Sequence, residues 1–486
     1  MSQLSTATLG LLPPRIRCPS YDRSKVKLGI VHLGIGAFHR AHQAVYADDM
    51  LERGDLRWGI LGASLRSPET RDRLGPQNGL YTVALRGSDH TDYRIIGSVI
   101  RCMVGPEDPA ALVEAMAQTD VKLVTLTVTE KGYCLDPGTG QLDESHTDIV
   151  HDLAHPSHPR SAPGFIVAAL RLRHEYGLPP FTVLSCDNLP ANGQKLRAVV
   201  IRLASLTDPV LGSFIAQHVA FPSSMVDRIV PQTTDEDRAS VALALGLDDA
   251  WPVVTEPFTQ WVIEDNFPEG RPDWGASGVE LITEVAPYEA MKLRWLNGAH
   301  SMLAYLGSLA GHLTVAEAIV DPNLGPFIAA FMADDVTPTL TLPAHANGAA
   351  YCAALLERFR NTSLKHRLAQ IASDSSQKIP QRFLGTARDR LGLGLPLGRL
   401  AYGIAGFIRY TGGRDAMGAP FVLNDPMAGT IRQRLASAGA TPEAAIDAVL
   451  GLQSMFGTDL LTDPRFRLPV LQAYQKLGAK PGLWFD

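Results

Sequence analysis

The apolar positions at the start of the chain predict a strand, a glycine turn and a helix. An apolar, β-prone run over residues 26–33 is broken by Gly34 and Gly36, and residues 37–54 then carry apolar side chains at helical spacing. A strand, a tight glycine turn and a helix in this order are typical of the opening unit of a Rossmann-type domain.

The same alternation continues to about residue 285. Further strands are expected at residues 58–65, 81–85, 121–128, 181–186 and 224–230, and helices at residues 110–117, 164–175 and 193–206. Residues 251–286 are expected to add strands. This pattern predicts an α/β sheet covered by helices on both faces.

From Pro287 onward the spacing of apolar residues becomes mostly helical. Helices are expected within residues 287–311, 314–319, 325–334, 347–360, 398–409 and 441–455. We therefore predict an α/β Rossmann-type N-terminal domain with added strands over residues 1–285, and a mostly α-helical C-terminal domain over residues 286–486, which would carry the substrate and catalytic groups.

Composition narrows the class of protein. The 486 residues are 45% apolar, and 44 basic against 50 acidic side chains, without runs, give no electrostatic footprint for nucleic acid or an anionic membrane. No apolar run approaches the roughly 18 residues that span a bilayer, and the N-terminus lacks the basic leader of a secretory signal. Five scattered cysteines, none in a CxxC pair, indicate reduced thiols and a cytoplasmic protein.

The glycine turn is the first candidate binding site. Its sequence keeps the first two glycines of G-x-G-x-x-G and has His39 in place of the third. The glycines would let backbone amides approach a pyrophosphate, although an ordinary strand-to-helix turn explains these residues equally well. The basic residues nearby favour the phosphate hypothesis. The expected cofactor-binding residues of the turn are Gly34, Gly36, Ala37, Phe38 and Arg40.

The end of the second strand bears on the choice between NAD and NADP. An NAD-type fingerprint expects an acid on the ribose hydroxyls there, but residues 62–67 read GASLRS, with no carboxylate before Glu69. Arg66 and Ser64 could receive a 2′-phosphate, which favours NADP(H). A solvated arginine at the end of a strand is the equally weighted alternative.

Residues 289–300 supply the candidate catalytic groups. At about 100° per residue, Glu289, Lys292, Asn297 and His300 share one polar arc of about 140° on an otherwise apolar helix. A lysine whose pKa is lowered by burial can take a proton from a hydroxyl, while Asn297 and His300 donate hydrogen bonds to the oxygen. The alternative is an amphipathic helix whose polar side is merely wet.

These segments resemble the long-chain mannitol dehydrogenase family. The likeness rests on VHLGIGAFHRAHQAVY (31–46), TVTEKGYC (127–134), SCDNLPANG (185–193), MVDRIVP (225–231), EPFTQWVIEDNF (256–267) and KLRWLNGAH (292–300), and it runs from about residue 25 to the C-terminus. The family includes mannitol 2-dehydrogenases and fructuronate (mannonate) reductases. It implies a Rossmann-type domain followed by a helical domain, an active site between them, NAD(H) or NADP(H) as cofactor, and no metal.

The resemblance also implies roles for single residues. Lys292 would be the general base and acid, and Asn188 with His300 or Asn297 would form the shell that stabilises the oxyanion. Asp227 matches a family acid near the site and is counted with the cofactor-binding residues. Lys378 could project a cation toward the substrate, as could Arg382, whereas a plain helix–loop junction around residues 373–382 is equally expected.

Two further motifs could indicate a metal site or a short-chain dehydrogenase, but the sequence around them argues against both. His151, His155 and His158 have a spacing that suits a metal, but Pro156 and Pro159 favour a solvated loop. Tyr288-x3-Lys292 imitates the pair of short-chain dehydrogenases, yet it lies about 250 residues beyond the glycine turn.

The candidate residues and the family resemblance predict NAD(P)-dependent interconversion of a hexitol and its 2-ketose, such as mannitol and fructose or a sorbitol/sorbose-type pair. Reduction of fructuronate to mannonate is the alternative within the class. A lyase that forms a Schiff base on Lys292 and a sugar- and nucleotide-binding regulator without turnover are the alternatives from other classes. A monomer or a small homo-oligomer is expected.

Overall fold

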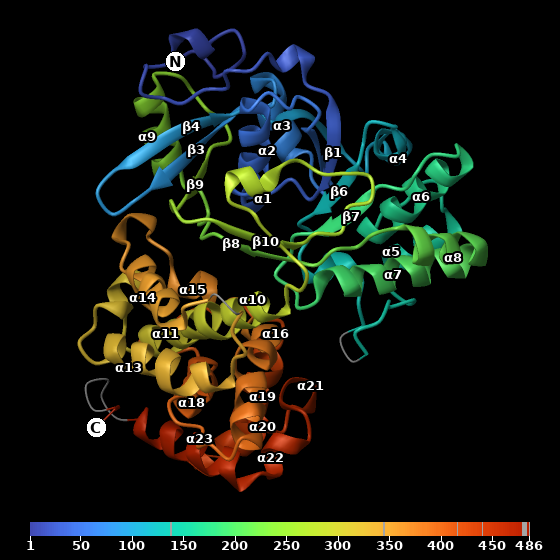
Figure 1. The fold of residues 1–486 in the computed structure, drawn as a ribbon. Helices are drawn as coiled ribbons and strands as arrows, with labels where there is room; N and C mark the ends of the chain where they lie inside the picture. Colours follow the sequence, from blue (N-terminus) through green and yellow to red (C-terminus); the bar gives the residue numbers. More distant parts are fainter. Residues whose placement is uncertain (137–138, 344–345, 416, 440, 479–483, 486) are drawn as a thin grey trace. The chain divides into compact units, whose positions relative to one another are not determined.

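The computed structural model describes residues 1–136, 139–343, 346–415, 417–439, 441–478 and 484–485 (Figure 1). The chain divides into two compact units, Met1–Ala286 and Pro287–Asp486. Each unit has its own hydrophobic core.

A five-stranded parallel sheet organises the first unit. Its strands are β1 (Leu28–Leu33), β2 (Gly59–Ser64), β5 (Val99–Val104), β6 (Leu123–Leu126) and β7 (Thr182–Ser185), in the order β5-β2-β1-β6-β7. Every neighbouring pair is parallel. Nearly continuous burial along the central strands explains why they read as apolar runs. The predicted Rossmann-type sheet is confirmed.

Helices cover both faces of this sheet, as predicted (Figure 1). One face packs against α4 (Pro109–Ala117), α5 (Thr147–Ala154), α6 (Ala162–Glu175), α7 (Asn192–Thr207) and α8 (Pro209–His218). The other face packs against α1 (Ala37–Ala41), α2 (Gln43–Glu52) and α3 (Glu69–Leu74). Because side chains alternate along a strand, Ile30 faces the α2 side whereas Val31 and Leu33 face the α6 side.

Two small sheets complete the unit, together with α9 (Asp235–Leu245). One has the order β4-β3-β9, with β3 (Tyr81–Arg86), β4 (Thr91–Ile96) and β9 (Val253–Thr255); the other has the order β11-β10-β8, with β8 (Ser224–Asp227), β10 (Gln260–Glu264) and β11 (Glu280–Ile282). The strands expected within 251–286 are thus present. The runs at 81–85 and 224–230 are strands, but of these small sheets. The apolar pattern missed β4 and β5, whose exposed positions interrupt it.

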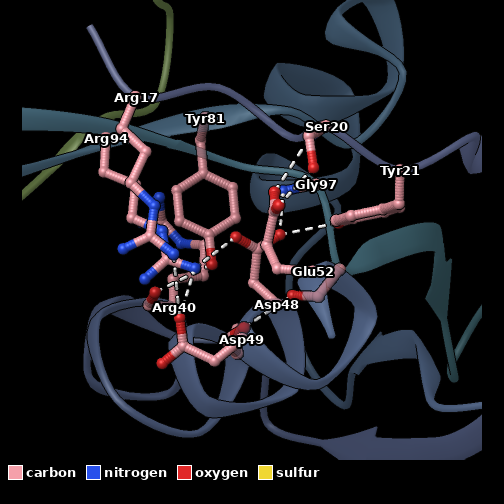
Figure 2. Close-up of polar contacts among 12 residues, drawn as sticks. Arg17, Ser20, Tyr21, Arg40, Asp48, Asp49, Glu52, Tyr81, Arg94 and Gly97 are labelled. Atoms are coloured by element: carbon pink, nitrogen blue, oxygen red, sulfur yellow. Dashed lines mark hydrogen bonds and ion pairs between the residues drawn. The ribbon is translucent and has the colours of Figure 1, made fainter. Parts of the chain in front are cut away.

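The first 25 residues are fastened to α2 by a buried polar network (Figure 2). The Tyr21 hydroxyl donates to Asp48 at 2.6 Å, and the Arg94 guanidinium donates to the other carboxylate oxygen at 2.6 Å. The Gly97 amide also donates to Asp48, at 2.9 Å. Ser20 donates to Glu52 and Arg17 donates to Asp49, so three carboxylates of α2 tie this segment to the fold.

The second unit is built from helices, as predicted. They are α10 (Ala286–Met291), which begins one residue before the unit, α11 (Gly298–Leu309), α12 (Val315–Ile319), α13 (Leu324–Ala330), α14 (Gly348–Phe359), α15 (Leu368–Ile371), α16 (Ser375–Ile379), α17 (Gly385–Gly392), α18 (Leu400–Tyr410), α19 (Ala428–Ser437), α20 (Pro442–Leu450), α21 (Gln453–Phe456), α22 (Asp459–Thr462) and α23 (Pro464–Lys476). Buried α11 packs against α18, which packs against α23. Three π-helical segments, Lys292–Asn297, Phe331–Val336 and Pro380–Leu384, interrupt the α-helices.

Among the described residues, no helix is both long enough and apolar enough to cross a bilayer.

Candidate functional site

The glycine turn has a geometry that only glycine permits at its first position. Gly34 has φ +94°, and a Cβ atom there would lie 2.2 Å from the Thr127 carbonyl oxygen. The Thr127 hydroxyl donates to the Gly34 carbonyl at 2.9 Å. At Gly36 the nearest atom to an added Cβ lies 3.8 Å away, so this side of the turn is open. The turn is packed tightly against the end of β6 and open where a ligand would approach.

A pocket of about 800 Å³ lies beside this turn. Gly34, Gly36, Ser64, Arg66, Thr127 and Thr129 are among the residues that line it. They follow β1, β2 and β6, so the pocket lies at the carboxyl ends of the central strands, where open α/β sheets bind their ligands. The structure thus brings Arg66 and the glycine turn together on one pocket.

Positive charge surrounds the pocket. Arg66, Lys131 and Arg160 line it with His151 and His158, against one lining carboxylate, Asp148. Such a pocket favours an anionic ligand.

The candidate metal motif is divided between a helix and a loop. His151 lies on α5, where its ring is 3.2 Å from an Asp152 oxygen, and His155 and His158 lie beyond the end of that helix. Within the described part of the chain, no group of three or more histidine, cysteine or acidic side chains is placed to hold a metal ion. His151 and His158 are instead parts of the pocket wall.

The side chain of Arg40 packs against Tyr81 and Trp251. Its buried guanidinium donates to the Trp251 carbonyl and lies over the rings of Tyr81 and Trp251, 5.3 and 5.5 Å from their centroids. The Tyr81 hydroxyl donates to the Arg40 carbonyl (Figure 2). Arg40 is not among the residues that line the pocket. The helix directs its side chain toward Tyr81 of β3, and a role of Arg40 in cofactor binding stays a prediction.

Ala37 and Phe38 are likewise absent from the residues that line the pocket. Phe38 stacks on His42 with ring centroids 5.1 Å apart, and both Ala37 and Phe38 pack against the core on the α2 side of the sheet. Of the five residues expected from the turn, the structure places the two glycines on the pocket.

Gly62, near the end of β2, is closely packed against Ile35. A Cβ atom on Gly62 would lie 2.2 Å from the Ile35 side chain, so that side chain occupies the space a larger residue would need. Arg66 follows β2, is exposed, and lines the pocket with Ser64. The polar side chains at this end of β2 that line the pocket are thus a hydroxyl and a guanidinium.

The lysine segment is not the regular α-helix that the sequence predicted. Lys292–Asn297 is π-helical and links α10 to α11. A π-helix has i→i+5 hydrogen bonds and more residues per turn, so the arc calculated at about 100° per residue does not apply here. Single π-helical turns inside α-helices are frequent at functional sites.

Lys292 and His300 are both buried, with 7% and 6% of their surfaces exposed. The His300 ring lies between Phe359 and His366, with centroid distances of 4.6 and 5.3 Å. Burial is the main cause that lowers the His300 pKa well below its usual value, and the charges of His366, Arg382, Arg358 and Lys292 lower it further. His300 is therefore neutral at physiological pH, and its buried Nε2 has no hydrogen-bond partner in the described part of the chain.

Arg382 connects two parts of this segment. Its Nη1 atom donates to the Ser301 hydroxyl at 2.8 Å and to the Asn297 carbonyl at 3.4 Å. The second of these bonds fixes the backbone of the half-buried Asn297, one turn before His300.

Lys378 is held at the turn between α15 and α16. Its ammonium donates to the Ile371 carbonyl at 3.3 Å and to the Ser373 carbonyl. These bonds fit the helix–loop junction that the sequence left open as an alternative.

The other two candidate residues belong to the first unit. Asn188 is exposed and follows β7, whereas Asp227 is buried at the end of β8. Next to Asn188, Asp187 is buried and accepts hydrogen bonds from Val128 and Thr129 on the pocket wall. Asp187 was not among the residues predicted from the sequence, although a polar residue directly after a buried strand was a signal.

Comparison with family models decides the classification. Residues 28–276 match the mannitol dehydrogenase Rossmann domain, and residues 284–478 match the mannitol dehydrogenase C-terminal domain. The chain belongs to the mannitol dehydrogenase family. It is thus an oxidoreductase of that family, and the resemblance stated from the sequence is confirmed.

Relatives of this family member match over nearly their whole length. It is 45% identical to D-mannonate oxidoreductase of Escherichia coli, over 94% of this chain and 95% of the relative. It is 43% identical to the uncharacterized oxidoreductase YeiQ of Escherichia coli, over 98% and 97%. Its fold matches the solved structure of Pseudomonas fluorescens mannitol 2-dehydrogenase in complex with NAD and D-mannitol, with a TM-score of 0.90, 38% identity and coverage of 98% and 96%.

Proposed function

We propose that this protein is an NAD(P)(H)-dependent oxidoreductase that interconverts a hexitol and its 2-ketose, with Lys292 as general base and without a metal. The observation that carries this proposal is a buried lysine close enough to a buried, neutral histidine for its charge to lower that histidine's pKa. The solved mannitol 2-dehydrogenase with NAD and D-mannitol supports the choice of cofactor and substrate.

The pocket beside the glycine turn fits the dinucleotide. Gly34 and Gly36 would hold its pyrophosphate, because the turn is open at Gly36 and the pocket wall is cationic. When bound, the nicotinamide supplies the acceptor or donor of hydride. Asp227, buried at the end of β8, stays a proposed member of the cofactor site.

The protein's own groups would manage the proton and the oxygen. In the oxidation direction, Lys292 would accept the hydroxyl proton of the substrate, and it would return that proton in the reduction direction. His300 would donate a hydrogen bond from its unpartnered Nε2 to the substrate oxygen, since a neutral imidazole can carry its proton there. Asn297 and Asn188 would supply further amide donors to the same oxygen.

We also propose a preference for NADP(H). Arg66 and Ser64 lie on the pocket at the end of β2, and residues 62–67 hold no carboxylate that would bind ribose hydroxyls. A guanidinium at this place would pair with a 2′-phosphate.

A second candidate is the reduction of fructuronate to mannonate. Arg382 and Arg358 are close enough to lower the His300 pKa, and cations near the reacting oxygen would favour a substrate that carries a carboxylate. The identity of 45% to D-mannonate oxidoreductase supports this candidate. Lys378, whose ammonium is bound to backbone carbonyls, is a weaker choice for the carboxylate than Arg382.

A survey of rates tests the proposal. Mannitol, sorbitol, fructose, sorbose and fructuronate would each be incubated with both cofactors, and the absorbance of reduced nicotinamide followed. Turnover of a hexitol and its ketose is the expected result. Turnover of fructuronate and mannonate alone would favour the second candidate. If no substrate changes the absorbance, a binding protein without turnover is favoured, and borohydride trapping of a ketose on Lys292 would indicate a lyase.

The cellular location and the oligomeric state of the protein are also proposed. Each of the five cysteines, all of which lie in the described residues, is free of disulfide bonds. This supports a cytoplasmic enzyme. We propose a monomer or a small homo-oligomer.

A further inference from the structure

The buried carboxylate of Asp187 joins the ends of two neighbouring strands. It lies at the carboxyl end of β7 and accepts hydrogen bonds from the Val128 amide at 3.1 Å and the Thr129 amide at 2.9 Å, each on a different oxygen. The hydroxyl of Tyr133, which is buried, donates to it at 2.8 Å. One side chain therefore fastens the loop after β6 to the end of β7.

The fastened loop contains a strained residue. Thr129 has φ +63° and ψ 169°. A β-branched residue is rarely found at positive φ, and this region of backbone conformation belongs almost entirely to glycine. Such a conformation persists only where surrounding contacts impose it. The two backbone amides bound by Asp187 are those of Thr129 and the residue before it.

This loop is a wall of the pocket beside the glycine turn. Thr127, Val128 and Thr129 all line the pocket. The Thr127 carbonyl fills the space next to Gly34, and its hydroxyl holds the Gly34 carbonyl. A shift of the loop would therefore move both the wall and the turn.

The backbone of Asp187 fixes a second candidate group. Its carbonyl accepts hydrogen bonds from the Asn192 side chain at 3.0 Å and the Leu189 amide at 2.8 Å. These bonds close the turn that carries Asn188. The same Asn192 amide group also donates to the Ser224 carbonyl of β8.

We propose that Asp187 is a positioning residue for the reaction. Its carboxylate binds the Val128 and Thr129 amides and so holds Thr129 in the strained conformation that shapes the dinucleotide pocket, and its backbone orients Asn188. This inference rests on the proposed function only in placing the dinucleotide in this pocket.

Substitution of Asp187 by asparagine tests the role. In Asp187→Asn, an amide NH₂ replaces one of the two oxygens that accept from backbone amides, so at least one charge-assisted bond is lost. We expect the Kd for the dinucleotide, measured by titration calorimetry on the full chain, to rise about 10- to 100-fold. The matched control is Asp249→Asn. Asp249 is also buried and also accepts from two backbone amides, those of Thr82 and Trp251, but neither of these residues lines the pocket, whereas Val128 and Thr129 do. The control should lower Tm and leave the Kd unchanged.

A second substitution separates positioning from general stability. Glycine adopts the backbone conformation of Thr129 without strain, so Thr129→Gly in the Asp187→Asn background should restore the Kd to within about threefold of wild type. If Asp187→Asn does not fold, Tyr133→Phe removes one donor alone and should raise the Kd about threefold.

The outcomes distinguish this inference from the proposed function. If the wild type binds the dinucleotide and Asp187→Asn binds it equally well, or if Thr129→Gly restores nothing, the positioning role is overturned while the proposed function stands. If the wild type binds neither NAD(H) nor NADP(H), the proposed function fails, and the placement on which this role depends fails with it.

Discussion

The imidazole of His39 stacks on that of His32, with ring centroids 3.5 Å apart and planes inclined by 16°. His39 occupies the place of the third glycine in G-x-G-x-x-G, where glycine normally allows a helix to approach a strand closely. Here a ring fills the space between α1 and β1. His32 Nε2 lies 2.9 Å from the Thr127 hydroxyl, which donates to the Gly34 carbonyl. His39, which replaces the glycine, thus helps to support the glycine turn through its contact with His32.

Removal of the His39 ring should destabilise the protein. Both rings are buried, and burial lowers the pKa of His32 to about 3 and that of His39 well below its usual value, so the stacked pair is neutral. His39→Ala would leave a cavity, and we expect the free energy of unfolding to fall by about 2–4 kcal/mol. Denaturant unfolding measures this change. His90→Ala, at an exposed histidine, is the control and should change little; equal stability of the two variants would contradict the role of the stack.

Lys292 should be needed for turnover and not for binding of the dinucleotide. Lys292→Met keeps most of the side-chain volume and removes the proton acceptor, so kcat should fall about 10²- to 10⁴-fold. The Kd for the dinucleotide, measured by calorimetry, should stay near the wild-type value. Lys476→Ala, at an exposed lysine on α23, serves as the control. Near-normal turnover of Lys292→Met would remove the lysine from the mechanism.

Arg66 should discriminate between the two cofactors. If its guanidinium pairs with a 2′-phosphate, Arg66→Ala should raise the Kd for NADP(H) about 10- to 100-fold and leave that for NAD(H) nearly unchanged. Fluorescence titration of the reduced cofactors measures both constants. Arg15→Ala, at an exposed arginine whose guanidinium is bound to the Ala244 carbonyl, is the control. Equal effects on the two cofactors would show that Arg66 is not a specificity residue.

Local sequence patterns predicted helices and strands. They did not predict contacts between residues that are far apart in the sequence. The apolar run before Gly34 identified β1 because that strand is buried on both faces. Arg40 lies within six residues of the turn, yet its partner is Trp251, which no local pattern could indicate. The arc that joined Lys292 to His300 was calculated for an α-helix, whereas Lys292–Asn297 is π-helical, which the spacing of apolar residues does not indicate.

The partners of the candidate site were the least predictable part. His366 and Phe359 contact His300 from more than fifty residues away in sequence, and Asp187 contacts a loop about sixty residues earlier. Such pairs arise only once helices and strands have assembled. The residue types that carry chemistry could be named from the sequence, but not the groups that orient them.

His300 should remain uncharged across the physiological pH range. Its pKa is far below the usual value because its ring is buried and faces cationic groups. In protein with ¹³C- and ¹⁵N-labelled histidine, the His300 signal, assigned by its loss in His300→Asn, should not shift between about pH 5.5 and 8. A titration midpoint inside this range would mean that the ring is charged during turnover and cannot act as a neutral donor.

Asp187 should make the stability of the protein depend on pH. Burial is the main cause that raises its pKa from 3.8 to about 6, and the nearby Glu130 raises it further, while the bonds from Val128, Thr129 and Tyr133 oppose the shift. Between these two pKa values the folded protein binds more protons at this site than the unfolded chain. The contribution of Asp187 to stability is therefore complete below about pH 4 and is lost as the pH rises through 6, by about 2–3 kcal/mol.

Affinity for the dinucleotide should rise with pH, whereas the stability contribution of Asp187 falls. The reason is that the hydrogen bonds that hold the loop favour the ionised carboxylate. As the pH falls from 7.5 to 5, wild-type protein should gain Tm relative to Asp187→Asn and lose more affinity for the dinucleotide than that variant does. Melting curves and calorimetric titrations on both proteins at matched ionic strength measure the two differences. Parallel pH profiles of wild type and variant in both measurements would show that Asp187 does not titrate in this range, since only the wild type carries an ionisable group at position 187.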